Sequence, residues 1–357
     1  MTRKMDLTRR TAITSALALS ACGREAASQT STIADTPLKS IASTPVGACV
    51  QRHQLDEPAF AALLARHYAQ LTPEWEMKME YILQDDGRFR FDRPDAIADF
   101  ARRNGMRLYG TTLVWYAQAM PAFLKLEGQG KPFANAYRNY ILAVAGRYRG
   151  LASGWDVVNE PVDDNGVDLR PSLWTRNLGV DEHMVMAFHH AKEADPDAVL
   201  FINEYHLENN PTKRATFMRL VERLLKAGAP IGGIGTQSHL DLDVSRPGMG
   251  RAALRDLASF GLPIHVSELD VSLGEKPNLA RLPDLLNRQA DLTRELAQAY
   301  MDLPPAQRFA FTVWGVRDSD SWLRGQNGQR PWDQPLPLDP AGRPKPMFQA
   351  LAEVLSG

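Results

Sequence analysis

The sequence predicts a single (β/α)₈ barrel, a closed parallel sheet surrounded by helices. From Val46 onward, short apolar runs alternate with longer segments whose apolar residues recur at helical spacing. This alternation gives eight strand–helix units in one unbroken series, and 357 residues are enough for such a barrel. An open, doubly wound sheet is the alternative, but no glycine-rich phosphate loop follows the first strand.

Each element of the barrel can be assigned from its pattern. The expected strands are residues 46–50, 68–72, 107–115, 154–159, 198–203, 231–237, 262–268 and 308–315. The expected helices are residues 58–66, 96–103, 133–148, 182–194, 212–227, 251–259, 282–299 and 347–355. Asp181 and Thr212 are expected N-caps, because their side-chain oxygens can accept a bond from a first-turn N–H group. We expect no linker or second domain within 46–357.

The first 45 residues have a different composition. A basic stretch, MTRKMDLTRR, precedes an apolar one that is too short to span a bilayer, so residues 1–22 are expected to be an export signal. The LSAC sequence at 19–22 resembles a bacterial lipobox, in which Cys22 would be lipidated. Alternatively, Cys22 is a small residue near an ordinary cleavage site. The arginine pair at 9–10 resembles a twin-arginine signal. Residues 23–45, rich in Ser, Thr and Ala, are expected to form a disordered tether.

Charge and cysteine content narrow the classes of partner. The formal net charge is −1 and no long basic run occurs, so we expect no nucleic-acid partner. Cys49 is the one cysteine besides Cys22, which predicts no disulfide in the mature chain and a buried thiol. His183, His189 and His190 share one expected helix, where an ordinary helix surface is favoured over a metal site. We expect no metal and no cofactor.

Polar residues follow the carboxyl ends of the strands, where barrel enzymes place their functional groups. The stretch WDVVNEP at 155–161 ends a buried strand on Asn159 and Glu160, and the following proline favours extended geometry at Glu160. The stretch VSELDV at 266–271 places Glu268 and Asp270 at another strand end. Two carboxyl groups on different strands are what glycosidic cleavage needs, one as proton donor and one as nucleophile. Taken alone, Glu160 would be interpreted as a solvated loop carboxylate, and the other strand ends favour the catalytic interpretation.

The other rim residues are of types that bind sugars. Aromatic rings suit the apolar faces of sugar rings, and amides, Lys and His suit hydroxyl groups. In chain order these residues are Glu74, Trp75, Lys78, Trp115, Tyr116, Tyr205, Gln237, His239, Trp314 and Trp322.

Together these motifs resemble glycoside hydrolase family 10, the (β/α)₈ endo-β-1,4-xylanases, from about residue 46 to the C-terminus. The matching pieces are TPEWEMK, LVW, WDVVNEP, NEY, GIGTQSHL, VSELDV and WGVRDSDSW, which occur in the family's order. The resemblance implies that Glu160 is the general acid/base and Glu268 the nucleophile of a retaining double displacement, with the two carboxyls ~5–5.5 Å apart.

The resemblance also implies roles for the surrounding residues. Asn159 would donate to the nucleophile or to the sugar 2-hydroxyl. His239, held by Asp270, would bond Glu268 and keep it ionised, although a purely structural histidine is an alternative. The remaining residues would contact substrate: Gln237 and Lys78 at glycone hydroxyls, Trp314, Trp322 and Trp115 around the scissile sugar, and Tyr205 towards the leaving group. Trp115 could instead serve only to pack the barrel top.

Three positions depart from the family pattern. Trp75 replaces an Asn, whereas Thr111 and Tyr116 each replace a His. The positions of Trp75 and Thr111 normally bind glycone hydroxyls, and each lost hydrogen bond costs on the order of 1–3 kcal/mol. Binding of a xylose chain is therefore expected to weaken by roughly ten- to several-thousand-fold.

These observations predict a retaining, endo-1,4-β-xylanase-like hydrolase. The substrate is expected to be a β-linked polysaccharide or oligosaccharide, with a non-xylan glycan such as a bacterial exopolysaccharide as the alternative to xylan. A catalytically silent carbohydrate-binding protein is a rival, which the paired glutamates argue against. A metal-dependent amidohydrolase is another, which the lack of His clusters argues against. We expect an exported monomer, either periplasmic or attached to the membrane through a lipid on Cys22.

Overall fold

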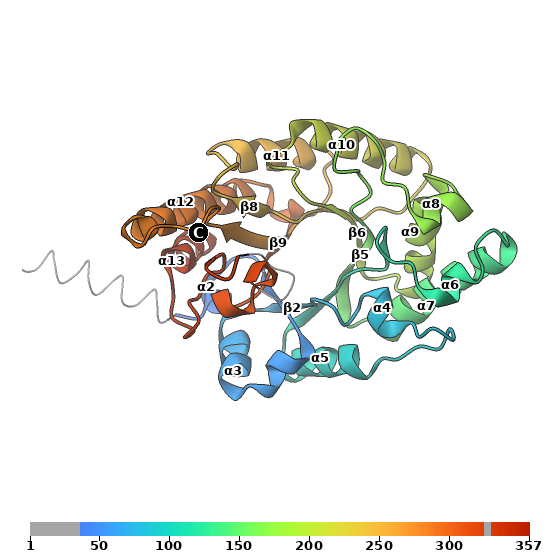
Figure 1. Cartoon of the computed structure of the whole chain (residues 1–357), viewed down its shortest axis with the longest axis horizontal. Helices are drawn as coiled ribbons and strands as arrows, with labels where there is room; N and C mark the ends of the chain where they lie inside the picture. Colours follow the sequence, from blue (N-terminus) through green and yellow to red (C-terminus); the bar gives the residue numbers. More distant parts are fainter. Residues whose placement is uncertain (1–35, 325–329) are drawn as a thin grey trace, which may run out of the picture. The chain divides into compact units, whose positions relative to one another are not determined.

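The computed structural model describes residues 36–324 and 330–357, and in these ranges the strands form one closed parallel barrel (Figure 1). Its order is β1-β2-β3-β5-β6-β7-β9-β10, and pairing of β10 with both β9 and β1 closes the ring. The predicted (β/α)₈ barrel is therefore confirmed, and the open sheet is excluded. The predicted export signal, with Cys22, and most of the predicted tether lie outside the described residues.

The strands lie close to their predicted positions. The barrel strands are β1 (Val46–Val50), β2 (Gln70–Pro73), β3 (Arg107–Gly110), β5 (Ala152–Asn159), β6 (Val199–Glu204), β7 (Gly233–Thr236), β9 (Ile264–Ser272) and β10 (Arg308–Val313). Two short strands, β4 (Val114–Trp115) and β8 (His239–Asp241), extend the carboxyl-end rim by pairing with β5 and β9. The predicted strand 107–115 is thus divided in two, and the peptide between Thr111 and Thr112 in the gap is cis.

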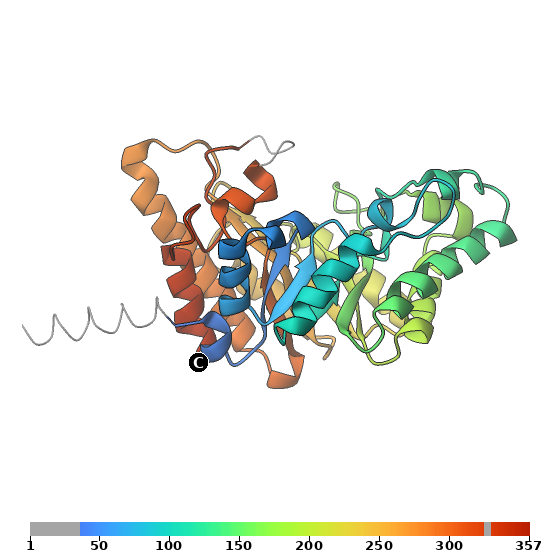
Figure 2. The same ribbon diagram turned by 90° about the horizontal axis from the view of Figure 1, so that it is seen from below.

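Helices cover the outside of the barrel, as Figure 1 shows from one end and Figure 2 from the side. The long ones are α3 (Pro58–His67), α5 (Asp92–Arg103), α7 (Lys131–Arg147), α9 (Glu182–Ala194), α10 (Pro211–Lys226), α11 (Met249–Ala258), α12 (Leu282–Met301) and α13 (Pro346–Leu355). Short α-helices are α2 (Leu38–Ile41), α4 (Met79–Ile82), α6 (Pro121–Leu124) and α8 (Leu173–Leu178). Short 3₁₀ turns are η1 (Arg52–Asp56), η2 (Leu279–Arg281), η3 (Pro305–Gln307), η4 (Asp318–Asp320) and η5 (Trp322–Arg324).

Residues 37–45 belong to the barrel domain. The side chain of Leu38 in α2 is fully buried, and α2 contacts α3 and α13. The Ser43 N–H group donates to the Leu355 carbonyl at 2.9 Å, which joins this segment to the last helix. The prediction of a disordered tether up to residue 45 is therefore wrong for its last residues, because Leu38 supplies an apolar anchor.

Neither predicted N-cap residue caps its helix through its side chain, although one of the two occupies the N-cap position. Asn210, and not Thr212, is the N-cap of α10, and its side chain accepts from the Lys213 N–H group at 3.0 Å. Asp181 does occupy the N-cap position of α9, but its carboxylate pairs with Arg223 instead of capping the helix. Within the described residues, no helix has the length and apolar character needed to cross a bilayer.

The barrel wall is tightly packed on both faces. On the outer face, a Cβ at Gly110 would lie 2.1 Å from the ring of Trp155, whose indole N–H donates to Asp195 after α9. On the inner face, the Tyr109 hydroxyl donates to Asp156 at 2.5 Å, and burial raises the pKa of Asp156 to about 8. Cys49 of β1 is buried as a free thiol, as predicted.

Candidate active site

A cleft of about 550 Å³ lies at the carboxyl end of the barrel, and both Glu160 and Glu268 line it. Glu160 directly follows β5, whereas Glu268 lies within β9. The structure brings most of the predicted site residues to the same cleft: Glu74, Trp75, Lys78, Trp115, Tyr116, Tyr205, Gln237, His239, Asp270, Trp314 and Trp322. The predicted residues that do not line it are Asn159, which lies beside Glu160 in a neighbouring pocket, and Thr111.

The backbone at Glu160 turns sharply as it leaves β5. Its φ is 57°, so the predicted extended conformation before Pro161 is wrong. The turn is anchored by the Glu160 N–H group, which donates to the Asn203 carbonyl of β6 at 2.9 Å. His206 and Ser238 also have positive φ, at 59° and 58°. A left-handed non-glycine residue costs on the order of 1–3 kcal/mol, and such strain is common at functional sites.

Three N–H donors hold the carboxyl group of Glu160. The indole of Trp115 donates to one oxygen at 2.7 Å, and the amides of Gln237 and Asn159 donate to the other at 3.0 and 3.2 Å. These donors come from different strand ends, so the barrel fixes the carboxyl orientation from several sides. Trp115 is therefore more than packing at the barrel top.

Glu268 is held by a second set of donors. The Asn203 amide donates to Oε1 at 2.9 Å, and His239 Nε2 lies 3.4 Å from Oε2. His239 Nδ1 lies 3.0 Å from Asp270, so the predicted Glu268–His239–Asp270 chain is present. Burial lowers the pKa of His239, but the carboxylates of Asp270 and Glu268 outweigh it and raise the value to about 10. At neutral pH the imidazole is therefore a cation in contact with Glu268.

Of the two roles expected for Asn159, donation to Glu268 is wrong, whereas donation to a sugar 2-hydroxyl stays a prediction. The Asn159 amide donates to Glu160 instead, and its Oδ1 accepts from the Asn203 amide at 2.9 Å. Asn203 thus uses both of its amide protons, one on Asn159 and one on Glu268. Asn203 lies opposite Asn159 in the β5–β6 register, which explains why the two side chains meet.

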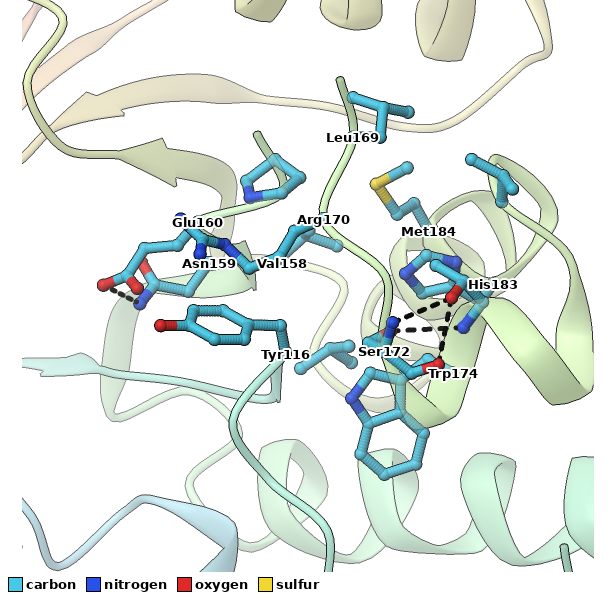
Figure 3. Close-up of a pocket in the computed structure, with 14 residues that line it drawn as sticks. Tyr116, Val158, Asn159, Glu160, Leu169, Arg170, Ser172, Trp174, His183 and Met184 are labelled. Carbon is cyan, nitrogen blue, oxygen red and sulfur yellow. Dashed lines mark hydrogen bonds between the residues drawn. The ribbon is translucent and has the colours of Figure 1, made fainter. Parts of the chain in front are cut away.

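Arg170 contacts several of the residues around Glu160. Figure 3 shows the small pocket behind Glu160, with Tyr116 and Arg170 side by side. The guanidinium carbon of Arg170 lies 4.1 Å from the Tyr116 ring centroid, and Arg170 donates to the hydroxyl of Tyr205 at 2.6 Å. It also donates to the Val162 carbonyl at 3.1 Å. Arg170, which sequence reasoning missed, therefore connects three loops next to the cleft.

A buried ion pair is hydrogen-bonded to the backbone of the loops that follow β5 and β6. Lys213 Nζ lies 2.9 Å from Glu204 Oε1, and the two side chains are 1% and 0% exposed. Glu204 accepts bonds from the N–H groups of Val162 and Tyr205, each at 2.9 Å. Burial raises the pKa of Glu204 to about 7, although Lys213 limits the rise. The pair positions the backbone that follows Glu160 and the backbone of Tyr205.

Thr111 was expected to bind substrate on the glycone side of the cleft, but the structure places it elsewhere. This residue is buried, bonds Asp156 and does not line the cleft, so the prediction that it binds substrate is wrong. Lys78 does line the cleft, where its ammonium lies 4.1 Å from the Trp75 ring centroid and 5.0 Å from that of Trp115. Glu74 accepts a bond from the Gln51 amide at 3.0 Å, and burial raises the pKa of Glu74 to about 7.

His183, His189 and His190, which were considered for a metal site, do not form one in the described part of the chain. His183 is buried, not on the helix surface as expected, and its Nδ1 lies 2.8 Å from the Gly179 carbonyl. Across the part of the chain that the structure describes, no three His, Cys, Asp or Glu residues are arranged to hold a metal ion.

Comparisons with known proteins agree on one family. The model for "Glycosyl hydrolase family 10" matches residues 37–354. Exoglucanase XynX of Acetivibrio thermocellus is 35% identical over 328 residues, which cover 87% of this chain but 28% of that protein. An endo-1,4-beta-xylanase of Geobacillus stearothermophilus is 35% identical over 326 residues, covering 87% of this chain and 95% of the relative. The chain therefore spans little more than a quarter of the first relative and nearly all of the second.

A solved structure has the same fold as this chain. The crystal structure of xylanase 10B from Thermotoga petrophila RKU-1, in complex with xylobiose, aligns with a TM-score of 0.81 at 29% identity. The alignment covers 90% of this chain and 97% of that one.

Proposed function

The chain belongs to glycosyl hydrolase family 10, and we propose that it hydrolyses β-1,4-glycosidic bonds of a xylan-type polysaccharide or oligosaccharide with retention of anomeric configuration. One observation carries the proposal. Glu160 and Glu268 line the same cleft, and each carboxyl group is held by its own N–H donors. Two carboxyl groups with separate supports can take the two different roles that this reaction requires.

In the first step, Glu268 attacks the anomeric carbon of the bound sugar. A bond forms between a Glu268 carboxyl oxygen and that carbon while the bond to the glycosidic oxygen breaks. Glu160 gives its proton to the departing oxygen, which leaves as a hydroxyl group. His239 and Asn203 hold the attacking carboxyl group, at 3.4 and 2.9 Å respectively, so its direction is set before the sugar arrives.

In the second step, one water molecule cleaves the glycosyl–enzyme ester. Glu160 takes a proton from the water as its oxygen attacks the anomeric carbon. The bond to Glu268 breaks, and its electron pair returns to the carboxylate. The cationic His239 stabilises that returning charge, and Glu160 regains its proton for the next cycle.

The substrate could also be a β-glycan other than xylan. The observation that favours this alternative is the contact between Trp75 and Lys78. The Lys78 ammonium lies over the Trp75 ring, 4.1 Å from its centroid. An amide at position 75 would leave Lys78 free to bind a sugar hydroxyl, whereas the indole competes for it through a cation–π contact. We therefore propose that catalysis follows the family and that recognition on the glycone side is altered.

The first test is hydrolysis of β-1,4-xylan by the wild-type protein and by Glu268→Ala. We expect the wild type to release xylo-oligosaccharides whose first-formed anomer is β, measured by proton NMR. The variant should be inactive, and added azide should rescue it on an activated aryl β-glycoside by forming the inverted glycosyl azide. Substantial hydrolysis by Glu268→Ala would remove Glu268 from the role of nucleophile. A wild type that cleaves only other β-glycans would establish the alternative substrate.

We also propose that the chain is exported and acts as a lipid-anchored monomer. The support is the lipobox-like LSAC sequence that ends at Cys22. Mass spectrometry of the mature N-terminus should find a diacylglyceryl group on Cys22, and Cys22→Ser should release the protein from the membrane fraction. Sedimentation of the mature domain should give a monomer. An unmodified residue 22 in the mature protein would exclude the anchor.

A further inference from the structure

The end of the barrel opposite the catalytic cleft carries a group of basic residues that we call the basic face. Since the strands are parallel and the cleft lies at their carboxyl ends, the segments that lead into the strands lie at the opposite, amino end. Four of these segments lead into the neighbouring strands β1, β2, β3 and β5, at 37–45, 65–69, 102–106 and 147–151. They contain no Asp or Glu but six Lys or Arg residues: Lys39, Arg66, Arg102, Arg103, Arg147 and Arg149.

The positive charge of the basic face is only partly neutralised within the protein. Arg102 and Arg147 pair with aspartates. Lys39, Arg103 and Arg149 are exposed and, within the described residues, form no ion pair with a carboxylate. By contrast, the loop between α9 and β6 at the same end contains two aspartates and no Lys or Arg. Since the whole chain has a formal net charge of −1, the basic face is a local concentration of charge.

The N-terminal segment joins the barrel at this same end. Helix α2, which precedes β1, contacts α3 and α13, and the Lys39 ammonium donates to the Ala65 carbonyl near the end of α3. Residues 23–35 connect this part of the chain to Cys22, and even a fully extended chain of that length spans at most about 45 Å. A lipid on Cys22 would therefore hold the domain close to a bilayer by the end that carries the basic face.

We propose that the basic face docks on an anionic phospholipid surface, so that the catalytic cleft opens towards the aqueous phase. Docking goes beyond the proposed hydrolysis, and it rests on the proposed lipid on Cys22 only for the tether. Each Lys or Arg close to an anionic bilayer favours binding by about fivefold, and the attraction decays within a Debye length. In the docked orientation the whole rim of the cleft is accessible to a long polysaccharide, whereas a domain that rotates freely on its tether would often turn the cleft towards the lipid.

The first experiment measures co-sedimentation of the unlipidated full chain, Cys22→Ser, with phosphatidylglycerol vesicles. The test variant neutralises three residues of the basic face: Lys39→Gln, Arg103→Gln and Arg149→Gln. The matched control neutralises three exposed residues at the carboxyl end: Lys125→Gln, Lys131→Gln and Arg281→Gln. All three chains share the basic N-terminal stretch, so its contribution cancels. We expect affinity to fall about tenfold or more in the test variant and to stay within about twofold in the control. Equal losses in both variants, or no loss in either, would overturn the inference.

The second experiment measures the orientation of the mature, lipidated protein on phosphatidylglycerol vesicles. A donor dye is attached to Asn104→Cys, within the basic face, or to Ser319→Cys, after β10, both at exposed positions. Cys49 is buried, so the dye reacts with the introduced thiol. Energy transfer to an acceptor-labelled lipid should be stronger from position 104 than from position 319, and equal transfer from both would overturn the orientation. A mature protein without lipid on Cys22 would count against the proposed anchor, and the vesicle-binding result would then decide the docking.

Discussion

Replacing Asn203 by aspartate should move the acid limb of the pH–activity profile upward. Asn203 is fully buried, and its amide donates to Glu268 Oε1 and to Asn159 Oδ1, both at 2.9 Å. Aspartate has nearly the same shape but places an acceptor where both donors were. Two carboxylates would then face each other in a buried site, and such a pair retains one proton over a wide pH range.

The size of the shift follows from the distance. Two unit charges 2.9 Å apart repel by about 6 kcal/mol at an effective dielectric constant of ~20. At about 1.4 kcal/mol per pH unit, this corresponds to an upper bound of roughly 4 units. The cationic His239 next to Glu268 reduces the repulsion, so we expect a shift of about 2–3 units. The sign is upward, because the variant must lose the shared proton before Glu268 can attack.

The assay is kcat/KM against pH with an activated aryl β-xylobioside, whose leaving group needs no proton from Glu160. Asn203→Ala is the matched control, since it removes the same hydrogen bond without adding a charge. It should lower kcat/KM about tenfold or more, as expected for a lost bond to a charged group worth ~1.5–3 kcal/mol. It should also move the limb upward, but by less than Asn203→Asp does, because it removes a donor to the carboxylate without adding a second negative charge. A profile for Asn203→Asp that coincides with that of Asn203→Ala would refute the reasoning.

Three further predictions concern the same cleft. Trp115→Phe removes the N–H group 2.7 Å from Glu160 and should lower kcat/KM for xylo-oligosaccharides about tenfold while changing that for an activated aryl glycoside little; equal losses on both would argue against it. The pKa of His239 is raised to about 10, above its unfolded value, so its stabilising effect is complete below pH ~6.5 and lost as the pH rises through 10. Urea unfolding should therefore show a deficit for His239→Gln that is largest near pH 6 and gone above pH 10, and a constant deficit would contradict this. Trp75→Asn should free Lys78 and lower KM for xylan severalfold with kcat unchanged, and an unaltered KM would show that Trp75 does not limit glycone binding.

The barrel could be predicted because its signals are local and repeated. The strand at 46–50 and the helix at 182–194 match β1 and α9 residue for residue. Pro45 and a glutamine flank the strand, and an aspartate flanks the helix at each end. The errors occur where tertiary contacts override local preference. In the sequence, Leu38 lies within a polar segment, whereas in the fold its side chain is buried and its helix contacts α13. At Glu160, the following proline favours extended geometry, but the residue is left-handed and its N–H group donates to a β6 carbonyl.

The site was predictable at the level of strand ends but not of side-chain partners. Position in the barrel follows from order along the chain, so Glu160, Glu268, His239 and Gln237 could be placed at one rim. Partners depend on the register between neighbouring strands, which the sequence does not display. Asn203 meets Asn159 because β5 and β6 pair at those residues, and Gly235 on β7 leaves room, since a Cβ there would lie 2.3 Å from Asn203 Oδ1.

On the proposed function, recognition on the glycone side can change without changing the catalytic groups. A sugar hydroxyl that binds Lys78 must draw the ammonium away from the Trp75 ring, whose centroid lies 4.1 Å from it. The hydrogen bonds that hold Glu160 and Glu268 come from other residues, on β4, β5 and β6 and after β7. A change at position 75 should therefore act on KM and leave kcat in place, which is the separation that Trp75→Asn measures.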